Sequence, residues 1–543
     1  MAAPATPSLA RARYRHLGDG YFSGASAWID LFGRFACAGL FSDAKLCFTA
    51  FHGPRQALPK NSLRLKERGR PAHRSCFDVG GTPTLLEFSS RFRFSSPARA
   101  AALALALLAA PVLLINQASA VTYTWSGNTS NAWVTTTNWI GGVAPTESNT
   151  TDVIISGINN VTSIVSNSPN YTVRSLTFSD TNDANTTLNL QNANSTTSLS
   201  KYLTFSSDSG NATLTVAAGS TGNKLINRTT NNAPTLFSDV NLTSSLDIVH
   251  NGDGTLTFGS LAIIKGTGGI NKSGTGTLIL NGANTYNGTT TINGGTLQLG
   301  GGGTTGSLST SSAISIGTGA VFSINRTNTV TQGTDFSGSA ITGTGGFLQN
   351  GSGTTVLNAT NTYNGTTTLN AGTVVISHAN ALGTTGNITF GANTTNTWTV
   401  NPSVNMTVSG RLAGNNGSLT KAGSGTLILS ANNTYTGDTT ITGGVLRVDG
   451  SIATSNLTVT SGATLQGVGT VGNTSMAGIL SPGISVGTLT VNGNLNLLAG
   501  SIYRYEIDAN QRSDLVVVSG RATIADSAIF KLSSAGGIDL NRL

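Results

Sequence analysis

The chain has 543 residues, of which only 10% are charged, with 68 glycines and a formal net charge of +8. Residues 1–120 hold 15 Lys and Arg against 6 Asp and Glu (+9), and residues 121–543 hold the remaining 15 against 16 (−1). The basic charge therefore belongs to the leading segment. The nearly neutral remainder lacks the basic stripe that strong binding to phosphate backbones requires, so no nucleic-acid partner is expected.

Residues 1–90 have scattered Arg, Pro and aromatic residues and no hydrophobic periodicity. We expect this extension to be disordered, or to stem from a start codon assigned too early; a long extended signal region is the alternative. The three cysteines of the chain, Cys37, Cys47 and Cys76, all lie here without the C-x-x-C spacing of a zinc site. We therefore predict no metal chemistry for them.

Residues 91–120 have the features of a secretory signal peptide. Arginines between positions 91 and 99 form a basic n-region, residues 100–115 form an apolar run, and an A-x-A site ends the segment. The run has about 16 residues, fewer than the roughly 20 that span a bilayer, so a membrane anchor is disfavoured. We predict cleavage between Ala120 and Val121. The mature chain then contains no cysteine, and its stability cannot come from disulfides.

Residues 121–170 open the predicted mature chain with three tryptophans, Trp125, Trp133 and Trp139. An end coil of a stacked structure has no neighbour on one side, and its unpaired strands are templates for pairing unless they are covered. We predict that this segment is an N-terminal cap that buries the first coil.

Residues 171–543 contain a 28-residue stretch that occurs three times. The copies begin at positions 273, 350 and 422, so their starts lie farther apart than one copy is long, and each copy is part of a longer unit. Such self-similarity points to stacked repeats. The copies are 273–300 (SGTGTLILNGANTYNGTTTINGGTLQLG), 350–377 (NGSGTTVLNATNTYNGTTTLNAGTVVIS) and 422–449 (AGSGTLILSANNTYTGDTTITGGVLRVD).

Each copy predicts three short strands and two corners. In the first copy the strands are 278–280, 290–292 and 297–299, of which the last alternates Leu, Gln, Leu. The corner at 284–288 supplies Asn and Gly for a positive φ or for a turn closed by a side chain, and the pair Gly294 and Gly295 forms the second corner. Three strands and two corners describe one rung of a coil.

Stacked rungs solve the problem that one rung cannot bury its apolar face. Like residues would lie about 4.8 Å apart on neighbouring rungs, and the recurring asparagines are expected to form amide ladders (Asn281 and Asn358; Asn284, Asn361 and Asn433). We therefore predict an all-β fold, a right-handed parallel β-helix, with the handedness taken from the general crossover rule. A β-sandwich or an array of β domains is the competing architecture.

The repeated pattern GTLxLxGxNTYxGxTTIxGGTLxL resembles the autotransporter-associated β-strand repeat, also called the passenger-associated transport repeat. The tryptophans near the start and the segments 462–465, 480–483 and 487–491 are also similar to parts of autotransporter passengers. The resemblance implies an exported, surface-displayed or released β-helical passenger, in the outer membrane or outside the cell. It implies no particular activity.

The same resemblance implies a membrane barrel after the passenger. Residues 508–543 show no run of barrel strands with aromatic girdles, so we expect that the gene continues, that the barrel is encoded separately, or that the protein is secreted.

Two glycine motifs match catalytic or cofactor patterns by letter. Residues 483–487 match G-x-S-x-G, but a strand pattern follows instead of the helix of a hydrolase elbow. Residues 301–306 match G-x-G-x-x-G, but a dinucleotide site needs a following helix and an acidic residue about 20 positions on. Both are predicted to be turns.

Acidic residues give two further candidates. Asp253, in the sequence 251–254, stands alone, whereas calcium-binding β-rolls repeat Gly and Asp. Near the C-terminus lie clustered charges (Arg504, Glu506, Asp508, Arg512 and Asp514). Paired carboxylates can carry acid–base catalysis, but alternation along 503–507 favours a solvated charged face. We predict no catalytic, cofactor-binding or metal-binding residues. The many N-x-S/T triplets follow from composition.

Two functions remain for the chain. The first is a non-enzymatic structural or adhesive surface protein, whose polar rod meets glycans, cell surfaces or other copies through many weak contacts. The second is a β-helical polysaccharide lyase or hydrolase, which needs a cleft of convergent acids, bases or calcium ligands that this sparsely charged chain does not supply in an evident way.

Overall fold

The computed structural model describes residues 120–535 and two earlier strands, with gaps at 128–129, 131, 147, 157–162, 167–169, 182–184, 191–200, 229–237, 384–385, 392–396, 401–402 and 404. The chain divides into two units, Met1–Gln117 and Ala118–Leu543. In the first unit, β1 (Lys45–Phe48) pairs antiparallel with β2 (Ser75–Asp78). The predicted signal peptide up to residue 119 lies outside the described residues.

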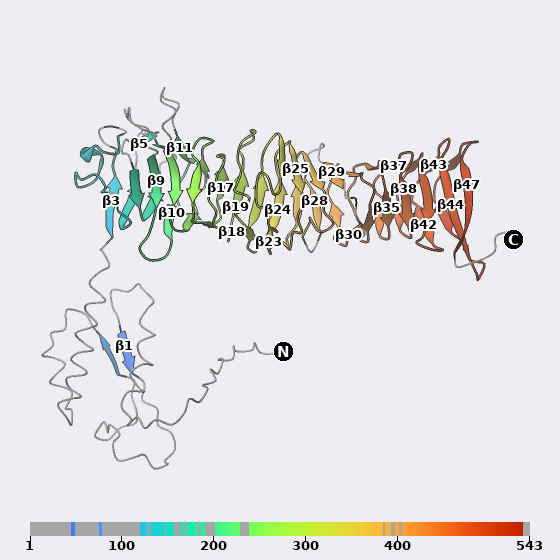
Figure 1. Cartoon of the computed structure of the whole chain (residues 1–543), viewed down its shortest axis with the longest axis horizontal. Coiled ribbons are helices and arrows are strands. Elements are labelled where there is room, and N and C mark those ends of the chain that lie inside the picture. Colours follow the sequence, from blue (N-terminus) through green and yellow to red (C-terminus); the bar gives the residue numbers. More distant parts are fainter. Residues whose placement is uncertain are drawn as a thin grey trace, which may run out of the picture. The chain divides into compact units, whose positions relative to one another are not determined.

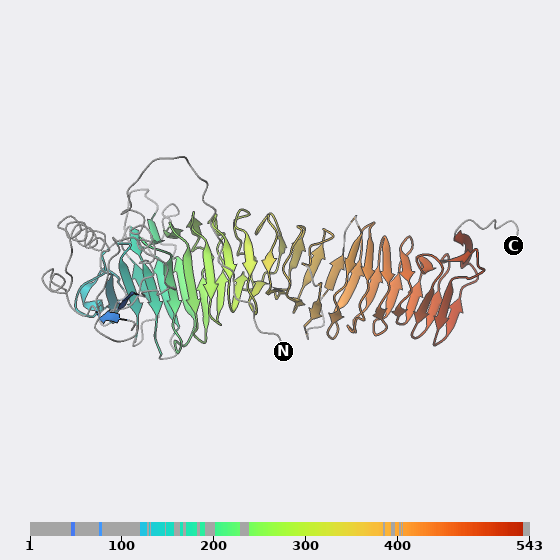
Figure 2. The ribbon, with the colours of Figure 1, turned by 90° about the horizontal axis from the view of Figure 1, so that it is seen from below.

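The second unit is a parallel β-helix, as predicted from the sequence (Figures 1 and 2). Alternate residues of its strands point inward and are buried, as in the pattern of β10, where Ala212, Leu214 and Val216 are at most 1% exposed. Parallel pairing joins each strand to the equivalent strand of the next coil. The described strands confirm the all-β solenoid; its handedness stays a prediction.

Three sheets form the N-terminal part of the stack. The nine-stranded sheet contains β3 (Val121–Trp125), β4 (Thr151–Ile155), β7 (Ser175–Phe178), β10 (Ala212–Val216), β13 (Leu246–His250), β16 (Ile270–Ser273), β18 (Thr290–Ile292), β20 (Ile314–Ile316) and β23 (Thr342–Gly343). The eleven-stranded sheet contains β5 (Ser163–Ser166), β8 (Thr186–Leu190), β11 (Lys224–Arg228), β14 (Thr255–Phe258), β17 (Thr277–Leu280), β19 (Thr296–Leu299), β21 (Val321–Ile324), β24 (Gly346–Gln349), β26 (Thr367–Leu369), β28 (Ile388–Phe390) and β31 (Leu412–Ala413). A four-stranded sheet contains β6 (Asn170–Val173), β9 (Lys201–Phe205), β12 (Ser238–Leu242) and β15 (Ile264–Gly266).

Three further sheets form the C-terminal part. The ten-stranded sheet contains β22 (Thr329–Thr331), β25 (Thr354–Leu357), β27 (Thr373–Ile376), β29 (Thr397–Val400), β32 (Ser418–Lys421), β34 (Thr439–Ile441), β37 (Leu457–Val459), β40 (Thr474–Met476), β43 (Leu495–Leu497) and β46 (Ala522–Ile524). The seven-stranded sheet contains β30 (Met406–Val408), β33 (Thr426–Leu429), β35 (Val445–Val448), β38 (Thr464–Gly467), β41 (Ile479–Pro482), β44 (Ile502–Asp508) and β47 (Ile529–Ala535). The last sheet contains β36 (Ser451–Ile452), β39 (Thr470–Val471), β42 (Thr488–Val491) and β45 (Leu515–Val518).

The first copy shows how the repeat builds coils. Its three predicted strands are confirmed as β17, β18 and β19, but β19 pairs directly with β17, so that Leu278 lies opposite Leu297. The third strand therefore already belongs to the next coil. One copy thus spans more than one rung, which corrects the one-rung interpretation of the sequence.

Successive copies, each taken together with the strand that ends at or just before its first residue, lie on different sheets of the helix. In the first copy β16 and β18 belong to the nine-stranded sheet, with β17 and β19 in the eleven-stranded sheet. In the second copy β24 and β26 belong to the eleven-stranded sheet, with β25 and β27 in the ten-stranded sheet. In the third, β32 and β34 belong to the ten-stranded sheet, with β33 and β35 in the seven-stranded sheet. Each copy is therefore displaced by one sheet around the coil, and equivalent residues of two copies do not stack.

The start of the stack is closed by tryptophans. Trp125, Trp133 and Trp139 are at most 2% exposed, and the ring of Trp139 meets those of Trp125 and Trp133 at centroid distances of 5.0 and 4.9 Å. A short 3₁₀ helix, η1 (Thr136–Asn138), leads into Trp139, whose Nε1 donates to the carbonyl of Trp133 at 2.7 Å. The extent 121–170 that the sequence predicts for the cap stays a prediction.

Candidate functional site

The repeated copy is the candidate functional element of the chain, and its second corner shows why glycine recurs there. Gly295, Gly372 and Gly444 have φ values of 61, 68 and 61°, in the left-handed region that favours glycine. A Cβ at Gly295 would also lie 2.5 Å from the carbonyl oxygen of Gly276. The preceding position has more room, since a Cβ at Gly294 would be 3.2 Å from its nearest neighbour, and the second copy has Ala371 there.

The first asparagine of each corner ties three coils together. The Oδ1 of Asn284 accepts from the backbone N–H of Ile264 at 3.0 Å, and its Nδ2 donates to the carbonyl of Ser307 at 2.9 Å. These partners lie one coil before and one coil after. The equivalent bonds recur in the other copies, at Asn361 (Ile341 N–H and Ala381 carbonyl) and Asn433 (Leu412 N–H and Ser451 carbonyl).

This arrangement corrects the expected Asn284, Asn361 and Asn433 ladder. Because successive copies lie on different sheets, these asparagines bind backbone groups instead of one another, and none has a positive φ. An amide ladder does occur elsewhere: Asn456 donates to Asp438 at 3.2 Å and Asn473 donates to Asn456 at 3.2 Å. The asparagine side chain therefore closes the corner through its hydrogen bonds. Gly288 lets the backbone of its coil approach the preceding coil, since a Cβ there would lie 2.3 Å from the nitrogen of Gly269.

The tyrosine of each corner is completely buried. Tyr286, Tyr363 and Tyr435 are each 0% exposed, and their hydroxyls share hydrogen bonds of 2.6 to 2.7 Å with Thr290, Thr367 and Thr439. Burial raises the pKa of each phenol, to about 12 for Tyr435, so the rings stay neutral. The tyrosines are therefore buried core residues that stabilise the corner, a role that the sequence interpretation missed by treating them as turn residues.

An inward-facing polar residue precedes each copy. Lys272 and Lys421 are 0% exposed, and Lys272 donates from Nζ to the carbonyls of Ser273, Gly274 and Gly294 at 2.8 to 3.1 Å. Lys421 bonds equivalently to Ala422, Gly423 and Gly443. Gln349 takes this position in the second copy, donating to Gly351 at 2.7 Å. Burial lowers the pKa of both lysines to about 8.

Sequence reasoning missed these lysines, although a signal was present. Strand alternation places Ile270 and Lys272 on the same face, and Leu419 and Lys421 likewise. A lysine on the buried face of a strand must find acceptors, because an unpaired buried charge is strongly unfavourable.

The G-x-S-x-G motif lies in a turn between β41 and β42. Ser485 is exposed, and the strand β42 follows it, as the sequence predicts. His250 is completely buried, and His378 contacts Thr360 and the backbone of Asn380. Among the described residues, no histidine is hydrogen-bonded to Ser485, so the structure does not assemble a nucleophile and base there.

The two remaining glycine motifs are also corners. Residues 301–306 follow β19 and lead to the strand β20, with Gly302 and Gly306 at positive φ. Residues 251–254 form a turn in which the N–H of Asp253 donates to Ser220 at 3.2 Å. Neither motif is followed by a helix among the described residues.

The clustered charges near the C-terminus hold a turn together. Asp508 accepts from the backbone N–H of Arg512 at 2.9 Å and from its Nε at 2.7 Å, and these bonds lower the pKa of Asp508. Asp514 accepts from the N–H groups of Gly487 and Glu506 at 2.8 and 2.9 Å. Burial nevertheless raises the pKa of Asp514. Both carboxylates thus serve as acceptors for the local backbone, and Arg504 is exposed as predicted for a charged face.

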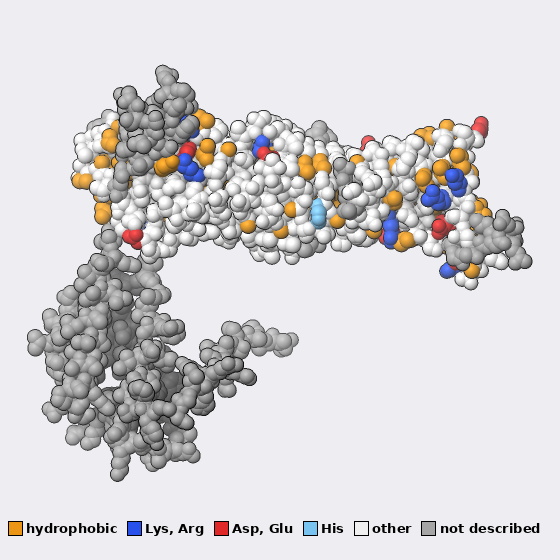
Figure 3. All heavy atoms as spheres, viewed as in Figure 1, with side chains coloured by type: hydrophobic (Ala, Val, Ile, Leu, Met, Phe, Trp, Pro, Cys, Tyr) orange, Lys and Arg blue, Asp and Glu red, His pale blue; other side chains and the backbone are white. Residues whose placement is uncertain are grey.

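Within the described part of the chain, no three His, Cys, Asp or Glu residues come together as a set able to hold a metal ion. The same residues contain no helix long and apolar enough to cross a membrane. The absence of catalytic and cofactor residues, like the cleavage between Ala120 and Val121, stays a prediction. Val121 begins β3 and is 47% exposed. On the face drawn in Figure 3, charged side chains are sparse.

The comparisons with known proteins centre on the same repeats. The family profile described as "Passenger-associated-transport-repeat" matches residues 270–299, 347–376 and 419–448, which include Lys272, Gln349 and Lys421. Two matches are to proteins named "Extracellular serine protease" from Serratia marcescens, at 46% identity over 102 residues and 41% over 101, each covering 18% of this chain. "Adhesin BmaC autotransporter" from Brucella suis biovar 1 (strain 1330) matches at 29% identity over 300 residues, 42% of this chain.

The chain spans about a tenth of the length of each of these relatives (10%, 9% and 10%). No solved structure matches it. The matches to the repeat therefore describe part of the chain, and the relatives show in what kind of protein such stretches occur.

Proposed function

Because three stretches of this exported, cell-surface or extracellular protein are passenger-associated transport repeats, we propose that it is a non-enzymatic passenger with a structural or adhesive role. Its β-helix presents polar side chains on many successive coils, so that weak contacts add along the stack. The sites it offers to glycans, cell surfaces or other copies are multiple and individually weak.

The observation that carries this proposal is the use of polar groups in the repeats. The Asn and Lys side chains at the copies point inward and bind the backbone of their own and adjacent coils, and the buried Tyr hydroxyls bond to Thr side chains. They serve the stack itself, and the half-buried outward positions of the strands hold Thr together with Ile, Val or Arg, as at Thr277 and Ile279 of β17 and Val445 and Arg447 of β35. Support also comes from the match to a protein named an adhesin, which covers more of this chain than the protease matches do.

Binding of the purified protein tests the proposal. We expect it to bind whole cells or a carbohydrate array with an affinity that rises steeply when the protein is clustered on beads, because multivalency multiplies weak contacts. Shortening the stack by whole coils should weaken bead binding progressively. Bead binding no stronger than that of a β-helix of unrelated sequence would contradict the adhesive role.

An extracellular hydrolase is the second candidate, favoured by the 46% identity over 102 residues to a protein named a serine protease. Ser485 is the exposed serine in a hydrolase-like motif. Cleavage of peptide or polysaccharide panels that is lost in Ser485→Ala, with binding unchanged, would support this candidate. Equal inactivity of both proteins would support the non-enzymatic assignment.

A further inference from the structure

Four ionisable side chains lie buried in successive coils at one corner of the helix. Asp180 follows β7, Lys224 begins β11, His250 ends β13, and Lys272 lies in β16. Each is at most 1% exposed. We call this set the basic column, because it holds two lysines and a histidine against one carboxylate. Burial of charge is costly even where the charge is hydrogen-bonded, so the column is a candidate weak point of the interior.

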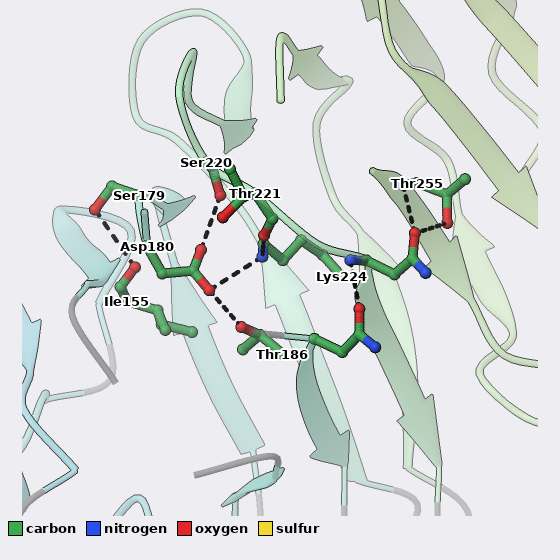
Figure 4. Close-up of polar contacts among 10 residues, drawn as sticks. Ile155, Ser179, Asp180, Thr186, Ser220, Thr221, Lys224 and Thr255 are labelled. Carbon is green, nitrogen blue, oxygen red and sulfur yellow. Dashed lines mark hydrogen bonds and ion pairs between the residues drawn. The ribbon is translucent and has the colours of Figure 1, made fainter. Parts of the chain in front are cut away.

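The carboxylate of the basic column is already fully engaged. Asp180 accepts from Thr186 at 2.6 Å, from Ser220 at 2.8 Å and from Nζ of Lys224 at 3.0 Å (Figure 4). Lys224 also donates to the carbonyl of Thr221. A protonated histidine in this corner would therefore find no free carboxylate in the column.

His250 occupies the next coil, between the two lysines. Strand register places it opposite Val216, and its neighbour Ile248 opposite Lys272. The ring packs against the following coil, since a Cβ at Gly276 would lie 2.4 Å from its Nδ1. Neither ring nitrogen makes a hydrogen bond of good geometry to the described residues.

The electrostatic surroundings favour the neutral ring. The pKa of His250 is lowered from 6.5 to about 4, first by burial and next by Lys272; the Gly254 backbone opposes this, and Lys224 adds a smaller lowering effect. Other nearby carboxylates do not face the ring: Asp247 lies on the outward side of β13, bound by Asn271 at 2.7 Å, and Asp253 is exposed in the following turn. In the neighbouring four-stranded sheet Asp239 pairs with Lys265 at 2.7 Å.

We propose that His250 is an acid-sensitive switch, whose protonation opens the coils that carry the basic column. A proton on the ring places a third buried cation beside Lys224 and Lys272, and opening the corner to water relieves the repulsion. The affected coils run from about residue 212 to residue 276, and the proposal does not depend on the adhesive role.

The sign of the effect follows from the two pKa values. The unfolded chain takes up the proton first as the pH falls below 6.5, whereas the folded chain resists until about pH 4. The opening equilibrium therefore rises between these values, by up to about tenfold per pH unit, and is roughly 160-fold higher at pH 4, where half of the folded rings are already protonated. Above pH 6.5 the switch is silent.

The third copy supplies an internal control. Its corner has the buried Lys421 in a carbonyl cage like that of Lys272, but the described residues include no histidine beside it. General acid destabilisation through surface carboxylates acts on both regions. A difference between residues 246–276 and residues 418–448 therefore isolates the histidine.

Hydrogen exchange of the full chain at pH 7, 6, 5 and 4, corrected for intrinsic rates, tests the switch. We expect protection of residues 246–276 to fall about a hundredfold more than that of residues 418–448. In His250→Gln this extra loss should vanish. An equal loss in the two regions, or an extra loss retained in His250→Gln, would overturn the proposal.

Lys272→Met provides a second test should the histidine variant fail to fold. Removing this charge raises the folded-state pKa of His250, which narrows the pH window and reduces the acid-dependent loss of protection. A purely structural role of Lys272 would lower protection equally at every pH. An unchanged pH dependence in Lys272→Met would contradict the switch.

Discussion

The first and the last described coils of the β-helix differ in how far their side chains are covered. At the N-terminal end, three tryptophans cover β3, and Trp125 is 0% exposed. Among the described residues, β46 and β47 are the last strands of their sheets, and Ile524 is 53% and Phe530 52% exposed. Stacked coils seal one another, but an end coil must be sealed by something else. At the first coil, three large tryptophan side chains cover the apolar face that no preceding coil covers.

The largest expected loss of stability comes from the tryptophans of the first coil, compared with an exposed residue of the last described coil. Trp139→Ala should lower the free energy of unfolding by about 3–5 kcal/mol, because it leaves a cavity among Trp125, Trp133 and Tyr123. Phe530→Ala, at a half-exposed position, should cost about 1 kcal/mol or less. Chemical denaturation followed by circular dichroism measures both. Equal losses would show that burial among the tryptophans contributes no more to stability than the half-exposed position of Phe530.

The second prediction concerns whether the corners of the first and third copies contribute equally to stability. Asn284→Ala leaves the N–H of Ile264 without its acceptor and removes one of the two donors to the carbonyl of Ser307, and Asn433→Ala does the same at Leu412 and Ser451. Each should cost about 1–3 kcal/mol. Asn432→Ala, at an exposed position, is the matched control and should change stability little. If the first copy proved far more sensitive than the third, distance from the cap would matter more than the corner itself.

A smaller effect is expected from the buried phenols. Tyr286→Phe and Tyr435→Phe keep the packed ring and remove the hydroxyl bonded to Thr290 or Thr439, for a loss of about 0.5–1.5 kcal/mol each. Thermal unfolding of the two variants in parallel measures this. A loss as large as that of Trp139→Ala would mean that the corner, not the cap, limits stability.

The smallest effect near neutral pH concerns the buried lysines. Their folded-state pKa of about 8 lies below the ordinary 10.5, so between these values the unfolded chain binds more protons. The free energy of unfolding should therefore rise as the pH increases from 8 to 10.5. In Lys421→Gln, which copies the glutamine of the second copy, the rise should be smaller. Urea titrations of both proteins between pH 8 and 10.5 measure the free energy of unfolding. An unchanged rise in Lys421→Gln would show that Lys421 is not the titrating group.

Much of the coil could be predicted from residue patterns. Alternation along 297–299 and the recurring glycines predicted the strands and corners, because side-chain period and positive φ are local properties. The burial of Trp125 and its partners also followed from their place at the start. The buried Lys272 and the neutral His250 were missed, since their environment depends on which coils lie above and below them.

The sequence alone determined the strand length, the turn chemistry and the parallel stacking of coils, because each of these follows from interactions within about 30 residues. Only the tertiary structure decided that successive copies lie on different sheets. The spacing of the copies along the chain does not state how many coils intervene, because segments between strands vary in length. That displacement turned the expected asparagine ladder into separate ties to the backbone, and the stacking of coils buried Asp180, Lys224, His250 and Lys272 in one corner.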